Sequence, residues 1–145
     1  MSMMPYFNLF EKQARKETRE VTFKGDPLIP DDDYGLLEYY CGDPECDCQM
    51  VMIGVVSRRQ KKQIATIVYT FDPAHEIPGM SNPDLDLAPQ AEFAKAFLQW
   101  FADLLRDDHA YEDRLKRHYT QVKNAETNPA HPMHAKFLAW QDEDT

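Results

Sequence analysis

The sequence predicts an α+β fold, a small antiparallel β-meander with C-terminal helices packed on one face. Two observations predict it. Three runs rich in strand-forming residues, 34–41, 49–57 and 63–71, follow one another with short polar turns between them, which is typical of a meander. Further along the chain, apolar residues recur at helical spacing instead. Strands that precede helices, rather than alternate with them, indicate a sheet covered by helices.

The N-terminal segment is expected to form a helix and then a short strand. Charged and apolar residues from Tyr6 to about Glu20 lie at helical spacing, so a short amphipathic helix is expected there. Residues 21–23 (VTF) predict a brief strand, which ends at the turn 25–27 (GDP).

The central strand determines the register of the meander. Residues 49–57 (QMVMIGVVS) are almost continuously apolar, which is typical of a strand covered on both faces. Polar turns at 42–45 (GDPE) and 58–62 (RRQKK) bound it. If this strand pairs with 63–71 around the basic turn, residues whose numbers sum to about 120 lie opposite each other.

After residue 71 the pattern changes from strands to helices. Residues 72–89 contain four prolines, so an irregular crossing loop is expected. A helix is expected to begin near 86–89, because apolar residues then recur every three or four positions. This apolar stripe consists of Leu87, Ala91, Ala94, Leu98, Phe101 and Leu105. A second helix is expected over 110–125 and a shorter third helix over 131–140.

Length and charge bound the organisation and the class of protein. A chain of 145 residues with 43% hydrophobic residues fits a single domain, residues 1–145. The net charge of −9 argues against a general binder of nucleic acid or anionic membranes, since both need a surplus of Lys and Arg. Residues 1–10 do not read as a secretory signal, and no stretch approaches the roughly 18 apolar residues of a membrane span. We therefore expect a cytoplasmic protein with a protein partner, and the oligomeric state stays open.

The three cysteines lie close together in the pattern C-x4-C-x-C. Cys41 ends the first predicted strand, and the turn that follows brings the chain back. Cys46 and Cys48 are two residues apart, so in an extended chain they project to the same side. The acidic segment 26–48 contains eight Asp or Glu and no Lys or Arg, which favours a cation. Thiols gathered by one turn are typical of a metal site, and we predict zinc.

Zinc needs four ligands, and the turn supplies three. The predicted register places residue 74 opposite residue 46, so His75 is the first candidate for the fourth ligand. Helices packed on the sheet could instead deliver His118, His131 or His134. A solvent molecule in the fourth position would make the site catalytic rather than structural.

Several functions are compatible with this cluster. The leading interpretation is a structural zinc site in a protein-interaction module. The first alternative is a small zinc-dependent hydrolase-type enzyme with Glu45, Asp47 or Glu76 as its general base. The second is a thiol-redox or metal-handling protein. The surrounding carboxylates should raise the pKa values of the thiols and leave them poor nucleophiles, which weakens the redox interpretation. Without a metal, the cysteines would simply be small buried hydrophobes.

Other motifs for chemistry are missing from the sequence. It has no Walker loop, no H-E-x-x-H, no G-x-G-x-x-G and no G-x-S-x-G. With five glycines in the whole chain, a phosphate-binding loop is disfavoured. The basic segments 58–62 and 114–118 are expected to be a solvated hairpin tip and a solvated helix face.

The segment YGLLEYYCGDPECDCQMVMIGVVSRR, continued by IATIVYTFDP and by RLKRHYTQVK, is similar to a family of uncharacterised bacterial proteins. In that family a strand ending in Y-C leads into D-P-x-C-D-C and a hydrophobic strand. The resemblance implies a metal-binding hairpin at Cys41, Cys46 and Cys48, and it implies no reaction. Some members carry a SecA-type C-terminal zinc motif, P-C-x-C-G-S-G, which this sequence lacks.

Overall fold

The computed structural model describes residues 3–86 and 90–144 of the chain. Within these residues an antiparallel sheet of six strands combines with five helices, so the predicted α+β class is confirmed. The strands are β1 (Met3–Pro5), β2 (Arg19–Phe23), β3 (Asp32–Cys41), β4 (Met50–Ser57), β5 (Lys62–Thr70) and β6 (Asp84–Leu85). The helices are α1 (Tyr6–Leu9), α2 (Glu11–Glu17), α3 (Ala94–Asp107), α4 (His109–Thr127) and α5 (His134–Asp144), with a short 3-10 turn, η1, at Pro73–His75.

The centre of the sheet is the predicted meander of β3, β4 and β5. β1 and β2 both pair with β3, β1 at its end and β2 at its start, and β6 pairs with β5. The β4–β5 register runs from Met50 opposite Thr70 to Val55 opposite Ala65, as predicted. A register shift beyond Val55 moves the remaining pairs by one residue, and Lys61 in the turn adopts a positive φ of 52°.

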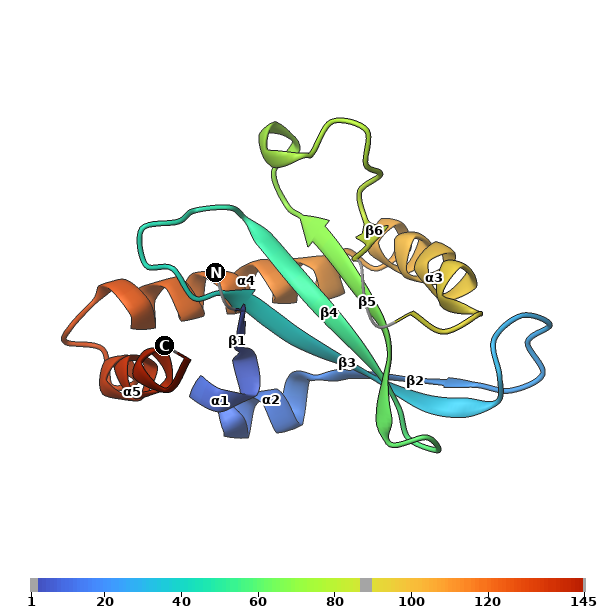
Figure 1. Ribbon diagram of the computed structural model, residues 1–145, viewed down its shortest axis with the longest axis horizontal. Helices are drawn as coiled ribbons and strands as arrows, with labels where there is room; N and C mark the ends of the chain where they lie inside the picture. The colour runs from blue at the N-terminus through green and yellow to red at the C-terminus, as the bar shows by residue number, and fades with distance from the viewer. Residues whose placement is uncertain (1–2, 87–89, 145) are drawn as a thin grey trace.

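The hydrophobic core lies between one face of the sheet and the helices. Figure 1 shows α4 crossing the sheet on this side, with α3 near β5 and β6. Alternate residues of β3 are buried toward these helices, as strand geometry requires. Tyr34 packs edge-on against Phe97 of α3, and Tyr40 packs edge-on against Tyr119 of α4. The sheet therefore presents a well-covered face to the C-terminal helices.

The opposite face of the central strand is less covered than its sequence predicts. Met50, Met52 and Val56 are only half-buried, whereas Val51, Ile53 and Val55 are fully buried. The continuous apolar run of β4 therefore belongs to a strand with one fully covered face. The physical reason is that α3 and α4 both pack on the same face.

Three helix boundaries differ from the sequence expectations. The N-terminal helix is broken at Phe10, whose φ of −125° and ψ of 58° are not helical. The helix α3 begins at Ala94, because the backbone N–H groups of Asp86 and Ala91 donate to carbonyls of β5 instead of forming a helical turn. Residues 87–89, which include Leu87 of the predicted stripe, lie outside the described residues. The third C-terminal helix begins three residues later than predicted, at His134.

Among the helices that the structure describes, none combines the length and the apolar character that crossing a bilayer requires.

Candidate metal centre

The three cysteines lie at the turn between β3 and β4. Cys41 is the last residue of β3, and the other two lie in the loop before β4. Asp43 shapes this loop, because its carbonyl accepts from the Cys46 N–H at 3.0 Å and its carboxylate accepts from the Glu45 N–H at 2.9 Å. Gln49, with a positive φ of 54°, ends the loop. The predicted turn therefore returns the chain toward Cys41.

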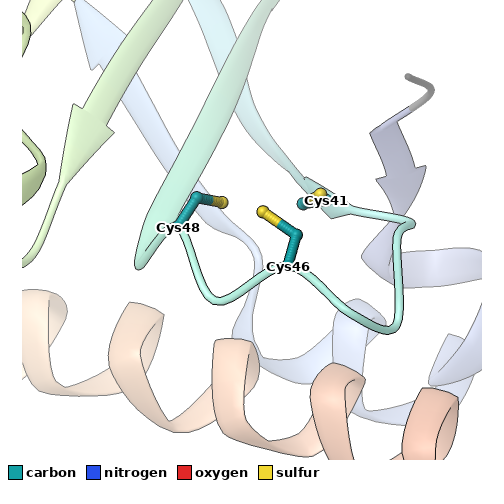
Figure 2. Close-up of side chains that lie close together, drawn as sticks. All are labelled: Cys41, Cys46 and Cys48. Atoms are coloured by element: carbon teal, nitrogen blue, oxygen red, sulfur yellow. The ribbon is translucent and has the colours of Figure 1, made fainter.

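The Sγ atoms of Cys41, Cys46 and Cys48 all lie within 4.8 Å of one another. Figure 2 shows the sulfur of Cys46 between the other two. Cys41 is buried, Cys46 and Cys48 are half-buried, and none of the three is in a disulfide. Thiolates around one zinc ion stand about 3.8 Å apart, given Zn–S bonds of about 2.3 Å. Closing this cluster onto a metal ion therefore needs only small side-chain movements.

Helix α4 packs against the cysteine turn and holds it in place. The Lys123 ammonium donates to the carbonyls of Cys41 and Asp43, both at 3.0 Å, and to Glu126 at 2.9 Å. These three bonds use all the donors of an ammonium group. The Lys123 side chain is nearly buried, so its ammonium group holds the turn at a fixed position on α4.

A second contact from α4 holds the other end of the turn. The Tyr119 hydroxyl donates to the Asp47 carboxylate at 2.8 Å and accepts from the Gln49 N–H at 3.1 Å. Tyr119 and Lys123 are four residues apart, so they share one helix face. The four-residue spacing of Tyr119 and Lys123 could be recognised in the sequence. Nothing in the sequence, however, indicates that this helix face contacts the cysteine turn.

Burial changes the acidity of the thiols. Burial raises the pKa of the Cys41 thiol to about 11, and burial also raises the pKa of Cys48. The neighbouring thiols add to both shifts, whereas Lys123 opposes them. The pKa values of Cys41 and Cys48 thus move in the expected direction, but the main cause is burial rather than the surrounding carboxylates. Thiols that stay protonated at neutral pH are weak nucleophiles.

The structure does not bring His75 into the sulfur cluster. His75 ends the turn η1, and its Nδ1 lies 3.1 Å from the carboxylate of Asp72. It is nevertheless close to the cysteine loop. The Phe71 N–H donates to the Gln49 carbonyl at 2.7 Å, which joins the two loops. The pKa of Asp47 is lowered chiefly by its hydrogen bonds from Tyr119 and Gln49, with the charge of His75 contributing.

The three rival histidines lie elsewhere. His118 is fully buried, with its ring nitrogens 2.6 Å from Glu38 and 3.1 Å from Glu17. His131 accepts from the Met133 N–H, and the Nδ1 of His134 lies 2.8 Å from a backbone carbonyl of α4. Across the described residues, no His, Asp or Glu joins the cysteine cluster.

Two cavities in the described part of the chain are large enough to consider as substrate sites, and His75 lines the smaller one. One, of about 980 Å³, lies between α2 and α5, and the other, of about 240 Å³, lies beside the loop that follows β5. Neither is lined by a cysteine. Of the candidate general bases, Glu45 and Asp47 are exposed on the cysteine loop, and Glu76 lines the smaller cavity.

Comparison with known proteins adds no assignment. No protein-family model, no curated protein and no solved structure gives a significant match to this chain. Functional inference therefore rests on the site itself.

Proposed function

We propose that this chain is a cytoplasmic zinc-binding protein, in which Cys41, Cys46 and Cys48 hold a structural metal ion and the surface binds a protein partner. The convergence of three Sγ atoms within 4.8 Å, from a turn fixed by α4, carries this proposal. We also propose that this turn is related to the Y-C-x-D-P-x-C-D-C hairpin of the uncharacterised bacterial family.

Zinc is the metal that this donor set favours. Thiolates are soft ligands that select zinc or copper(I) over calcium and magnesium. Three thiolates around a divalent ion leave one negative charge, and the ammonium of Lys123, which also pairs with Glu126, lies beside the turn and attracts it. The cysteine loop is therefore suited to a divalent thiophilic ion.

His75 is our proposed fourth ligand. Its Nδ1 faces the Asp72 carboxylate, the arrangement that typically orients a metal-binding histidine and leaves its Nε2 lone pair for the metal. The turn that carries His75 is tied to the cysteine loop at Gln49. A small shift of this exposed turn would complete a Cys₃His site.

A structural role fits better than the two alternatives. A catalytic zinc needs an open position next to a substrate cavity; no cysteine lines either of the two cavities, and of the proposed ligands only His75 lines the smaller one. A redox role needs an activated thiolate, whereas burial raises the pKa of Cys41 to about 11. Both observations support a metal that stabilises the turn.

The first test replaces the central thiol. We expect Cys46→Ser to abolish stoichiometric zinc and to lower the melting temperature, because a serine hydroxyl is a poor zinc ligand. Elemental analysis of purified protein and thermal unfolding measure the two effects. The exposed neighbour variant Glu45→Gln serves as the control and should change neither. Full zinc occupancy in Cys46→Ser would rule out the proposed site.

The second test concerns the fourth ligand. X-ray absorption of the zinc-loaded protein should show three sulfur ligands at about 2.3 Å and one nitrogen at about 2.0–2.1 Å. In His75→Ala the imidazole scattering that identifies this nitrogen should disappear and the zinc affinity should fall, with three sulfur atoms retained. The exposed histidine variant His109→Ala should keep the original spectrum. If the nitrogen persists in His75→Ala, another histidine is the ligand.

A further inference from the structure

The smaller cavity lies at the end of β5, on the loop that leads to β6. In Figure 1 this loop, residues 71–83, forms a wide arch beyond β5, and we call it the arch. The cavity has a volume of about 240 Å³, and its apolar lining includes Met50 and Val68 from the sheet and Ile77 and Met80 from the arch. Ile77 and Met80 are 52% and 42% exposed, so the arch presents apolar surface to solvent beside the cavity.

Three carboxylates also line this cavity, Glu76, Asp84 and Asp86. In the part of the chain that the structure describes, none of them forms an ion pair with a lysine or an arginine. Asp84 accepts from the N–H groups of Leu85 and Ser81, and these bonds lower its pKa and keep it charged. The cavity therefore combines an apolar lining with unbalanced negative charge.

The arch is anchored to the sheet at Asn82, which holds this side of the cavity in place before any ligand arrives. The Asn82 side chain makes two hydrogen bonds with the backbone of Thr70, one accepted and one donated, each at 3.0 Å. Its amide also donates to Glu76 at 3.2 Å, which fixes the position of that carboxylate. A preformed site loses less conformational entropy on binding.

We propose that this cavity receives an arginine side chain from a protein partner. An arginine has an apolar stem and a cationic head, which matches the apolar lining and the three carboxylates. The volume lies below the roughly 300–1,000 Å³ of small-molecule sites and suits one long side chain. Arginine is also enriched at the centres of protein interfaces. This inference rests on the interaction part of the proposed function and names its partner chemistry.

The test uses two peptides that differ only in charge. Acetyl-Gly-Leu-Arg-Leu-Gly-amide is titrated into the ¹⁵N-labelled full-length protein, alongside the same peptide with citrulline, a neutral isostere, in place of arginine. We expect amide shifts confined to residues around the cavity, with the arginine peptide binding more tightly and losing affinity as salt rises. Equal binding of both peptides, or shifts centred on the groove between α2 and α5, would overturn the proposal.

Variants then identify the carboxylates. We expect Glu76→Gln and Asp86→Asn each to weaken the arginine peptide about two- to fivefold, without changing the binding of the citrulline peptide. The control is Asp113→Asn, an exposed carboxylate on α4 outside the cavity, which should change nothing. If the double variant Glu76→Gln/Asp86→Asn bound the arginine peptide with unchanged affinity, the proposal would be contradicted. Zinc content is measured separately in the wild-type sample, so failure of the zinc-loaded wild type to bind the arginine peptide rejects the arginine site alone.

Discussion

The buried side chain of His118 contacts several elements of the fold. It is fully buried, and its two ring nitrogens face carboxylates of Glu38 on β3 and Glu17 on α2. Both ring nitrogens of His118 therefore lie within hydrogen-bonding distance of a carboxyl group. The ring also stacks on Tyr6, with centroids 4.0 Å apart. One residue thus joins the N-terminal helices, the sheet and α4.

This network predicts how stability depends on pH. Burial opposes ionisation of Glu17, but hydrogen bonds from Gln13 and His118 and the charge of Arg117 outweigh it and lower its pKa below the ordinary 4.5. A lowered folded-state pKa contributes stability above the ordinary value, which is lost as pH falls through the folded pKa. The stability difference between wild type and Glu17→Gln should therefore be largest near neutral pH and should shrink below about pH 4.5. Urea unfolding measures it, and Glu11→Gln, in an exposed pair, should show no such trend.

The sequence held little information about this network. It identified His118 as a possible zinc ligand, because a histidine on a helix packed against the sheet was free to reach the cysteines. Its partner Glu38 is 80 positions away in the chain. The local pattern shows only one charged residue within an apolar strand. The pairing depends on how α4 crosses β3, which no local pattern specifies.

At the scale of elements, the cysteine turn depends on α4. Lys123 donates two hydrogen bonds to the turn and one to Glu126 on its own helix, and the carboxylate of Glu126 is fully buried, with burial raising its pKa. We expect Lys123→Met to lower the free energy of unfolding by about 2–3 kcal/mol, since it leaves a buried carboxylate unpaired. Zinc affinity should fall about tenfold or more, because the turn loses its support.

A second substitution separates these two effects. Adding Glu126→Gln to Lys123→Met removes the unpaired charge, so the double variant should regain part of the lost stability. Its zinc affinity should stay low, because the carbonyls of Cys41 and Asp43 still lack their donor. Chemical unfolding and competition with a zinc chelator measure the two quantities. Recovery of both together would mean that Lys123 acts only through Glu126.

Elements were predictable where their determinants are local. The meander and its register followed from apolar runs separated by polar turns, and both are present between β3 and β5. The start of α3 was misplaced because the spacing of Leu87 and Ala91 fits a helix. The N–H of Ala91 instead donates to Ile64 of β5. Pairing along the sheet edge overrides helical spacing there.

At the scale of the whole molecule, the core and the proposed metal site are separate. The fully buried aromatic and aliphatic residues lie between the sheet and the C-terminal helices, where Phe97, Phe101 and Leu115 are inaccessible to solvent. The cysteine turn lies at one end of β3 and β4, and of residues 41–49 only Cys41 and Gly42 are buried. The fold therefore should not require the metal, in contrast to zinc fingers, which unfold without it.

Metal removal tests this separation. With free zinc buffered at about one hundred times its Kd, binding adds about 2.7 kcal/mol to stability, so chelation should lower the melting temperature by about 5–11 °C. Far-ultraviolet circular dichroism should stay unchanged at 25 °C, since the sheet and its helices keep their packing. Hydrogen exchange should accelerate between residues 41 and 49, while β3 to β5 and α4 remain protected. If the circular dichroism signal were lost on chelation, the metal ion would be required for folding. The hydrophobic core alone would then be insufficient to hold the fold together.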